Sequence, residues 1–421
     1  MSLTESKSST LSNASSNKAG NRGYSRRSLM VLILGSLSAF GPLCLDMYLP
    51  ALPKLANDLH TTASMAQLSL TACLLGLAIG QVIVGPLSDT RGRRSPLVIS
   101  LIIYAISSLL CVFAPTAGVL NTLRFIQGLS GSAGIVLSRA IVRDMYSGTE
   151  MTKFFSLLML VNGAAPILAP LFGGQLLQFV SWRGVFVVLS IIGVLMLLSV
   201  FLWLPETLPA ERRQSGGLRT TLGTFLRLLR DRQFIGYCLS QAFVTAAMFG
   251  YISGSSFVLQ NIYHVTEQTY SMIFAMNGVG IIIASQMTGR LAGRIKEIAL
   301  LRFGLGVALC ASLALLTAII MKGSLFSILL PLFFVVSCVG IVGTSTFPLA
   351  MQRHAQAAGS ASALLGLLPY ILGAAVAPLV GLGGDNNALP MGLIIASANV
   401  IAVMCYIFIA KPKKSNLHSS S

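Results

Sequence analysis

Two residues of opposite charge lie inside long apolar segments of the chain. Asp46 is the only one of the 12 acidic residues well inside such a segment, and Arg124 is the only basic residue so placed. A carboxylate in hydrocarbon costs at least about 2.5–3.5 kcal/mol, so an ionisable group there is a functional candidate. The two residues therefore predict charge chemistry within a membrane rather than at a water-exposed surface.

The positions of Asp46 and Arg124 permit them to meet. Counted from the predicted helix ends, both lie ~10 Å below the same membrane surface, at 1.5 Å per residue. Burial disfavours the charged form of a carboxylate and a nearby cation favours it, so a conformational change can release or take up a proton there. The alternative is a structural ion pair or an arginine that reaches the surface, although apolar residues can replace such a pair at little cost.

The composition excludes an ordinary water-soluble protein. Of the 421 residues, 54% are hydrophobic and 10% are charged, and the mean hydropathy is +0.80. Soluble chains are about a quarter charged. A bilayer makes this much apolar surface favourable, so we expect an integral membrane protein.

Apolar runs long enough to cross the bilayer recur along the chain. About 20 apolar residues span the hydrocarbon as a helix, and no segment alternates at the period of two that a membrane β-barrel requires. We predict an all-α membrane protein with twelve spans. They cover residues 28–50, 65–86, 96–114, 118–140, 154–178, 184–204, 234–258, 269–291, 299–320, 325–348, 357–381 and 389–410.

The basic residues fall on one side of this topology. Of 29 Lys and Arg, 25 lie in the segments that share a side with the amino terminus, and three, Lys54, Arg183 and Lys322, lie on the other. Positive residues mark the cytoplasmic side, so both termini are expected in the cytoplasm. The net charge of +17 therefore reflects topology, and no contiguous basic domain indicates a nucleic-acid partner.

The chain divides into two halves of six spans. Residues 28–204 and 234–410 flank a basic, polar linker at 205–233, and the segments 1–27 and 411–421 are predicted to be cytoplasmic tails. A signal peptide is the alternative interpretation of the first basic segment and apolar run. We expect an uncleaved first helix instead, because the apolar run continues to Asp46 without a cleavage site of small residues. Short sequence matches recur between the halves at offsets of 204 and 208 residues, which indicates tandem repeats with substrate bound between them.

Other kinds of site find no support in the sequence. The seven cysteines are scattered singly, without ligand spacing, so neither a disulfide framework nor a metal site is predicted. The four histidines fall in predicted loops or tails, a phosphate-binding Gly-x-x-x-x-Gly-Lys-Ser/Thr loop is absent, and no nucleophile and base have recognisable spacing. We therefore expect no cofactor and no enzymatic activity.

The loop after the second span, from Gly85 to Arg94, carries a distinctive pattern. Its glycines allow a tight turn, and Asp89 can cap a helix start or pair with the nearby arginines. The segment resembles the signature loop of the major facilitator superfamily, with Asp89, Gly92 and Arg93 in register. In that family the loop locks the outward-closed state, so the resemblance implies a cytoplasmic gate formed by Gly85, Asp89, Gly92 and Arg93.

Two further helices carry motifs of the same family. Arg124-Phe125-Ile126-Gln127-Gly128 resembles the fourth-helix motif, whose arginine is linked to proton transfer. Residues 165–174 resemble the fifth-helix motif of antiporters, which implies a pliable helix at Pro166, Pro170, Gly173 and Gly174. Alanines at 165 and 169 depart from that motif but keep a face of small residues for close helix approach. A plain packing groove is the alternative there.

The segment from Leu45 to Pro53, together with Trp182-Arg183, Leu204 to Leu208 and Ala358 to Gly366, resembles the Bcr/CflA branch of drug:proton antiporters. The resemblance extends over nearly the whole chain apart from the tails. It implies a monomeric transporter of a bacterial inner membrane that exports small amphiphilic drugs in exchange for protons. Asp46 would be the coupling carboxylate and Arg124 its partner.

The substrate pocket is expected on the central helices, where aromatic and amide side chains suit varied drugs. The candidate residues are Tyr48, Asn162, Phe249, Tyr251, Ser255 and Asn277. A metabolite transporter of the same fold is one alternative function. A non-transporting receptor or scaffold and a membrane-embedded enzyme are more remote, because the buried Asp46 and Arg124 argue against the former and the lack of a polar cluster against the latter.

Overall fold

The computed structural model describes residues 29–146, 148–213, 218–351, 358–384 and 386–410. Almost all of these residues lie in helices, and the part of the chain that is described contains no β-strand beyond one isolated bridge. A helix satisfies its own backbone N–H and C=O groups, which hydrocarbon cannot do. The predicted fold class, an all-α membrane protein, is confirmed. The predicted tails at 1–27 and 411–421 lie outside the described residues.

A helix at Leu29–Ser38 opens the described chain. The α-helices that follow are α2 (Phe40–Asp46), α3 (Leu52–Asp58), α4 (Ala63–Arg91), α5 (Arg94–Val112), α6 (Ala117–Met145), α7 (Gly148–Leu176), α8 (Trp182–Trp203), α9 (Leu218–Arg230), α10 (Arg232–Phe257), α11 (Glu267–Leu291), α12 (Glu297–Ile320), α13 (Leu325–Met351), α14 (Ala358–Val380) and α15 (Leu389–Cys405).

Ten helices within the described residues are long and apolar enough to cross a membrane, or eleven if the bent pair Leu29–Ser38 and Phe40–Asp58 counts as one span. Helix α7 stands at the predicted fifth span, and many of its side chains lie outside the described residues. The exact number of twelve therefore stays a prediction. The first span, expected to be continuous, is bent by 41°.

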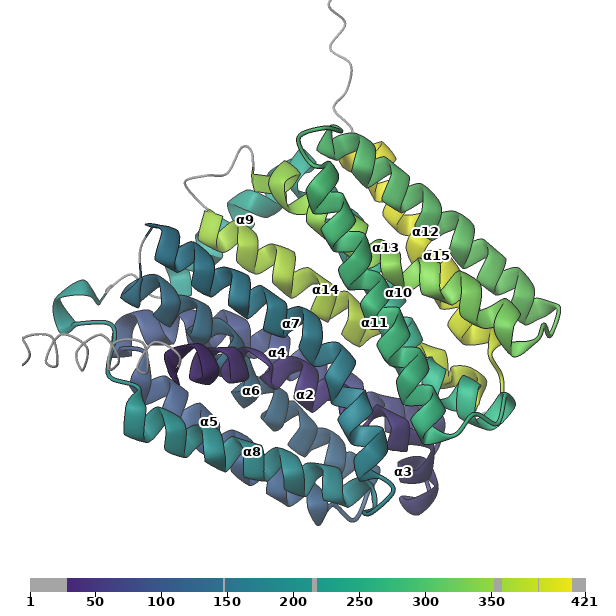
Figure 1. Cartoon of the computed structure of the whole chain (residues 1–421), viewed down its shortest axis with the longest axis horizontal. Coiled ribbons are helices and arrows are strands. Elements are labelled where there is room, and N and C mark those ends of the chain that lie inside the picture. Colours follow the sequence, from purple (N-terminus) through teal and green to yellow (C-terminus); the bar gives the residue numbers. More distant parts are fainter. Residues whose placement is uncertain (1–28, 147, 214–217, 352–357, 385, 411–421) are drawn as a thin grey trace, which may run out of the picture.

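The two halves form separate groups of helices. Figure 1 shows the helices up to α8 together on one side, in purple to teal, and α10 to α15 on the other, in green and yellow. Two helix pairs join the groups, because α4 packs against α14 and α7 against α11. Thr62 and Thr266 accept hydrogen bonds from the first turns of α4 and α11, so equivalent caps begin corresponding helices at the 204-residue offset of the sequence repeats.

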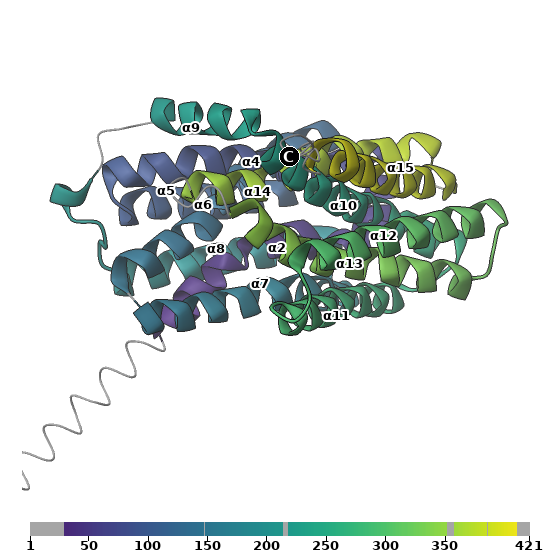
Figure 2. The ribbon, with the colours of Figure 1, turned by 90° about the horizontal axis from the view of Figure 1, so that it is seen from above.

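The ends of the bundle differ in charge, and we name them accordingly. The basic end holds the last turns of α4, α6 and α11, with Arg91, Arg143 and Arg290, and the opposite end holds their threonine-capped first turns. The basic end is the one that the sequence assigns to the cytoplasm. The linker between the halves forms a helix there, α9, whose Phe225 and Leu228 are buried against α10 and α14 and which runs along the outside of the bundle (Figure 2).

Glycines bring α4 and α6 into close contact. A Cβ at Gly128 of α6 would collide with the backbone of Cys73, and one at Gly76 of α4 would collide with the backbone of Phe125. Neither obstacle is the end of a flexible side chain, so it cannot move aside. The small residues therefore set the distance between the two helices.

We predict opposite effects for two alanine substitutions in α6. Gly128→Ala forces α4 and α6 apart and should lower the free energy of unfolding by about 1–3 kcal/mol. A Cβ at Gly118 meets nothing within 4 Å, so Gly118→Ala should leave stability unchanged or raise it by up to about 1 kcal/mol. Thermal unfolding in detergent measures both, and equal melting temperatures would contradict the packing argument.

Candidate functional site

Asp46 ends α2, beyond the bend that the first span makes between Ser38 and Phe40. A short 3-10 helix at Leu49–Ala51 follows, and α3 begins at Leu52, so prolines at 50 and 53 enter the chain in quick succession. Proline lacks the N–H that continues a helix, so these two prolines explain why α2 does not continue past Asp46. At the bend itself, Pro42 cannot donate to the carbonyl of Ser38, four residues earlier. The side chain of Asp46 is only 5% exposed.

A cavity of about 240 Å³ lies beside Asp46, between the two halves. The amino-terminal half contributes Pro42, Leu45, Asp46 and Pro166, and the rest of the wall comes from α10, α11, α13 and α14. Of the residues expected in the pocket, Phe249, Tyr251 and Asn277 line it. Sequence reasoning missed other wall residues, among them Met248, Phe274 and Tyr370, because nothing in a single sequence shows which face of a buried helix meets the cavity.

The polar groups of the cavity wall come mainly from its carboxy-terminal side. The Asn277 Nδ2 atom donates to the Tyr251 hydroxyl at 2.9 Å, and the Tyr251 ring stacks on Phe274 with centroids 5.6 Å apart. Among the described residues, Asp46 has no hydrogen-bond or ion-pair partner. The cavity thus combines one unpaired carboxyl group, one amide and several aromatic rings.

Arg124 lies fully buried inside the amino-terminal half, and the structure does not join it to Asp46 in an ion pair. Its Nη1 atom donates to Gln127, whose Nε2 atom donates to the Ser108 hydroxyl at 2.7 Å. The guanidinium carbon lies 4.4 Å from the centre of the Tyr48 ring. Within the described part of the chain, the Nε and Nη2 atoms have no hydrogen-bond partner.

The remaining pocket candidates are placed differently. The Tyr48 hydroxyl bonds to Ser69 at 2.9 Å and Ser255 to Tyr270 at 3.3 Å, and neither Tyr48 nor Ser255 lines the cavity. Tyr48 packs under Arg124 instead. Asn162 belongs to α7, but its side chain lies outside the described residues.

The fifth-helix motif lies in α7, where both Pro166 and Pro170 interrupt the helical hydrogen bonding. A Cβ at Gly173 would collide with the backbone of Met47, and one at Gly174 with Ser271 of α11. The two glycines therefore let α7 approach the residue next to Asp46 and, on another side, the other half of the protein.

The segment from Gly85 to Arg91 is helical, which corrects the expectation of a loop. Helix α4 continues past Pro86 to Arg91, and the turn is made by Gly92, whose φ of +91° favours glycine. Asp89 lies in the last turn and does not cap a helix start. It forms an ion pair with Arg93 at 2.6 Å, in agreement with the alternative expectation that it pairs with a nearby arginine.

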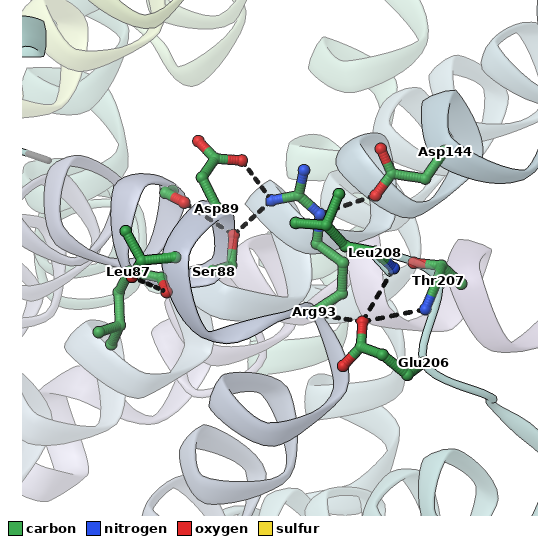
Figure 3. A network of polar contacts seen from close by, with 10 residues as sticks. Leu87, Ser88, Asp89, Arg93, Asp144, Glu206, Thr207 and Leu208 are labelled. Carbon is green, nitrogen blue, oxygen red and sulfur yellow. Dashed lines mark hydrogen bonds and ion pairs between the residues drawn. The ribbon is translucent and has the colours of Figure 1, made fainter. Parts of the chain in front are cut away.

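Arg93 is the centre of a network of polar contacts (Figure 3). Its guanidinium donates to Asp89, to the Ser88 hydroxyl and, at 2.7 Å, to Asp144 of α6. Burial opposes the charge, but hydrogen bonds to Asp144 and Asp89 outweigh it and raise the pKa of Arg93. All these partners belong to the amino-terminal half, so the network joins α4, α5 and α6 and does not cross to the other half.

Glu206, in the linker, caps the start of α5. Its Oε1 atom accepts from the backbone N–H of Arg93 at 2.8 Å and from Thr207 and Leu208 at 3.0 Å. Burial alone would raise the pKa of Glu206, but these backbone donors outweigh it and hold the pKa below its ordinary value. The sequence analysis did not single out Asp144 and Glu206. Both are acidic residues in segments rich in arginine, and this could have indicated that they pair with basic groups.

Polar contacts between the halves gather at the opposite end. Most are neutral side chains that donate to backbone carbonyls of the other half: Ser64 to Pro378 at 3.3 Å, Gln67 to Ser253 at 3.1 Å, Gln260 to Pro50 at 3.0 Å and Gln268 to Gly174 at 3.4 Å. Lys54 and Glu267 add an ion pair at 2.7 Å. The two halves are thus held together beyond the cavity, on the side away from Arg93.

Comparisons with known proteins agree on the kind of protein. Residues 32–378 match the family model described as Major Facilitator Superfamily. The uncharacterized MFS-type transporter YdgK of Bacillus subtilis is 46% identical over 92% of this chain and 96% of its own. The bicyclomycin resistance protein homolog of Haemophilus influenzae is 30% identical over 90% and 96%, and multidrug resistance protein D of Escherichia coli is 25% identical over 90% and 95%.

Solved structures share the fold at low sequence identity. A bacterial homolog of the human lysosomal transporter Spinster superposes with a TM-score of 0.70 at 16% identity, covering 91% of this chain and 97% of that one. The xylose transporter XylE from E. coli gives 0.68 at 16% identity, covering 94% and 100%. These neighbours are transporters, not enzymes.

We predict that the contacts of Glu206 weaken in acid. Because its pKa is lowered on folding, the stabilisation is complete above about pH 5 and is lost as the pH falls through the lowered value, below about 4.5. Glu206→Gln should lower the free energy of unfolding by about 1 kcal/mol at neutral pH, as for a lost helix cap. It should also reduce the loss of stability between neutral and acidic pH. Thermal unfolding against pH checks this, with Glu211→Gln in the same linker as the matched control. Identical pH profiles for wild type and Glu206→Gln would contradict the assignment.

Proposed function

The chain belongs to the major facilitator superfamily, and we propose that it is a proton-coupled secondary transporter that exports small amphiphilic drugs by alternating access. Membership makes it a membrane transporter of small molecules and not an enzyme. The direction of transport, the coupling to protons and the class of substrate are the proposal.

One observation carries the proton coupling. Asp46 faces a cavity between the halves, is 95% buried and has no hydrogen-bond or ion-pair partner among the described residues. An uncompensated carboxylate at such a depth is expensive, so a structural role would leave it paired. A proton or a substrate group is the natural partner, and competition between the two at one carboxylate couples their movements.

Arg124 contributes to this coupling without a direct bond. Its charge is fixed by Gln127 and by the rings of Tyr48 and Phe186, whose centres lie 4.4 and 5.6 Å from the guanidinium carbon. A positive charge held in place near a cavity carboxylate influences the balance between its two protonation states. We therefore retain Arg124 as the electrostatic partner of Asp46 rather than as an ion-pair partner.

The cavity wall suits an amphiphilic substrate. Phe249, Tyr251, Phe274 and Tyr370 offer aromatic faces, while Asn277 and Asp46 provide polar contacts. Such a mixture binds apolar bodies of varied shape and orients them through few polar groups. The names of the relatives, bicyclomycin resistance protein homolog and multidrug resistance protein D, support drugs over metabolites.

The distribution of contacts supports alternating access. The halves are joined at the opposite end by Ser64, Gln67, Gln260, Gln268 and the Lys54–Glu267 pair, whereas the Arg93 network stays within one half. If the basic end is cytoplasmic, as the positive residues indicate, this arrangement corresponds to a state closed to the outside. We place the protein in the bacterial inner membrane as a monomer with both termini inside.

We predict that Asp46→Asn abolishes coupling. The amide keeps the shape of the carboxyl group but cannot carry a proton, so drug-dependent proton flux in proteoliposomes should fall to the level of empty vesicles. Glu211→Gln, the same chemical change at an exposed linker residue, should keep the wild-type flux. Proton-driven drug export by Asp46→Asn would overturn the assignment, and flux driven by metabolites but by no drug in a substrate panel would favour a metabolite transporter.

We predict that the Lys54–Glu267 pair biases the protein toward the state seen here. Glu267→Gln should shift the populations toward opening of the opposite end by up to about fivefold, since exposed ion pairs contribute about 0.2–1 kcal/mol. Spin labels at exposed Gln178 and Leu382, in a Cys310→Ser background, measure the separation of the halves.

The charge swap Lys54→Glu with Glu267→Lys should restore the original distances. Arg183→Ala breaks an ion pair with Asp58 that lies at the same end but within one half, so it should leave the distances unchanged. A Glu267→Gln distribution identical to that of wild type would show that this pair does not influence the equilibrium.

A further inference from the structure

A larger groove lies on the surface of the carboxy-terminal half, away from the central cavity. It has a volume of about 730 Å³ and runs between α12 and α13, with α12 at the periphery of the bundle (Figure 1). Its wall is apolar and includes Gly306, Ala311, Ala314, Leu330, Pro331 and Phe334. Phe303 and Phe334, which also line it, are 62% and 46% exposed, so the groove faces the bilayer.

The groove exists because several residues of α12 that line it have small side chains or none. A Cβ at Gly306 would meet nothing within 4 Å, and the alanines at 311 and 314 continue the small-residue face along α12. On the other wall, Pro331 cannot donate to the carbonyl of Ser327, and its ring pushes that carbonyl aside. The space between the two helices is therefore left for a molecule other than the protein.

Arg302 stands at the basic end of the groove. It is exposed, its Nε atom donates to the Tyr406 hydroxyl at 2.6 Å, and its guanidinium carbon lies 5.8 Å from the centre of that ring. No carboxylate among the described residues pairs with it. Tyr406 thus holds one edge of the guanidinium, and the two terminal nitrogens remain for an anion at the level where lipid head groups lie.

A second apolar groove adjoins the first. It has a volume of about 340 Å³, lies among α11, α12 and α13, and shares Phe303, Val307 and Phe334 with the larger groove. Because these three side chains line both grooves, the two grooves lie next to each other and form two adjoining channels. Two apolar channels beside one cation match a molecule with two apolar chains and one anionic head.

We propose that these grooves bind a diacyl phospholipid with an anionic head group, its phosphate at Arg302 and one acyl chain in each channel. The length agrees, because Arg302 to Ala314 is about 18 Å along a helix at 1.5 Å per residue, slightly more than half of a hydrocarbon core of about 30 Å. The lipid belongs to the leaflet at the basic end. This site is independent of the proposed substrate and of proton coupling.

Photocrosslinking in nanodiscs tests the site. The full-length protein is reconstituted in phosphatidylcholine with a trace of phosphatidylglycerol that carries a diazirine in one acyl chain, and the labelled peptide is identified by mass spectrometry. We expect label on α12 and α13. Arg302→Ala should reduce it about fivefold, the ratio that one basic residue near an anionic lipid contributes, and Gly306→Leu should reduce it further by filling the larger channel.

Two variants serve as matched controls. Arg227→Ala removes an exposed charge from α9 at the same end, and Gly118→Leu adds the same side chain to another open glycine, so both should keep wild-type labelling. Labelling by the same diazirine on phosphatidylcholine should be weak and insensitive to Arg302→Ala. Equal labelling by both lipids, or full labelling of Gly306→Leu, would overturn the proposal.

Cys310 supplies a second readout without any mutation. It lines the larger groove and is the only exposed cysteine among the seven, all of which lie in the described chain. Its reaction with N-ethylmaleimide should slow when phosphatidylglycerol is present and should not slow in Arg302→Ala. Bifunctional maleimides that join Cys310 to Cys310 regardless of lipid would identify the groove as an interface between two copies, and displacement of the crosslinking lipid by transported drugs would identify a substrate site. Either result would contradict the lipid assignment.

Discussion

The structure depends on one constraint, the free-energy cost of polar groups in hydrocarbon. It makes nearly every described residue helical, because a helix pairs its own backbone groups. It also moves charge to the ends of the helices, where Arg93 and Glu206 find partners beside water. Of the charged side chains that the structure describes, only Asp46 and Arg124 stay buried at depth, and both are shielded by protein rather than facing lipid. The two exceptions therefore define where function is to be sought.

The protein treats these two charges differently, and the difference has a physical reason. Arg124 is surrounded by aromatic faces, an amide and a hydroxyl network, which stabilise a permanent cation without neutralising it. Asp46 is left beside a cavity with no partner of its own among the described residues. An ion pair between them would satisfy both and remove the reason for a proton or a substrate to bind. Separation of the two keeps the carboxyl group available.

Sequence alone predicted the parts that follow from hydropathy and charge. The helix positions and the concentration of basic residues at one end follow from the distribution of a few charges in an apolar chain. The choice of Asp46 and Arg124 as functional residues comes from the same distribution and stays a prediction. It did not predict that α4 continues through Asp89, because this depends on a proline, Pro86, that is tolerated inside the helix. Nor did it predict that Glu206 caps α5, because that contact joins residues more than 100 positions apart. Likewise, Tyr48 and Ser255 carry the right chemistry but face other helices, and periodicity cannot tell the two faces of a helix buried on all sides apart.

The two ends of the bundle use bonds of different strength, and this fits a protein with two states. Within the amino-terminal half, Arg93 makes charge-assisted bonds to Asp89 and Asp144, which are strong and hold three helices as one body. Between the halves, glutamine and serine side chains donate to neutral carbonyls, and each such bond contributes only about 0.5–1.5 kcal/mol net. A few weak bonds between rigid bodies can break together at a cost that binding in the cavity is able to offset. The ion pair between Lys54 and Glu267 also crosses between the halves, but the Lys54 side chain is 66% exposed, so water weakens this contact. A buried charged network of the Arg93 kind across the halves would hold a single state. The described contacts between the halves include none, as the proposed cycle requires.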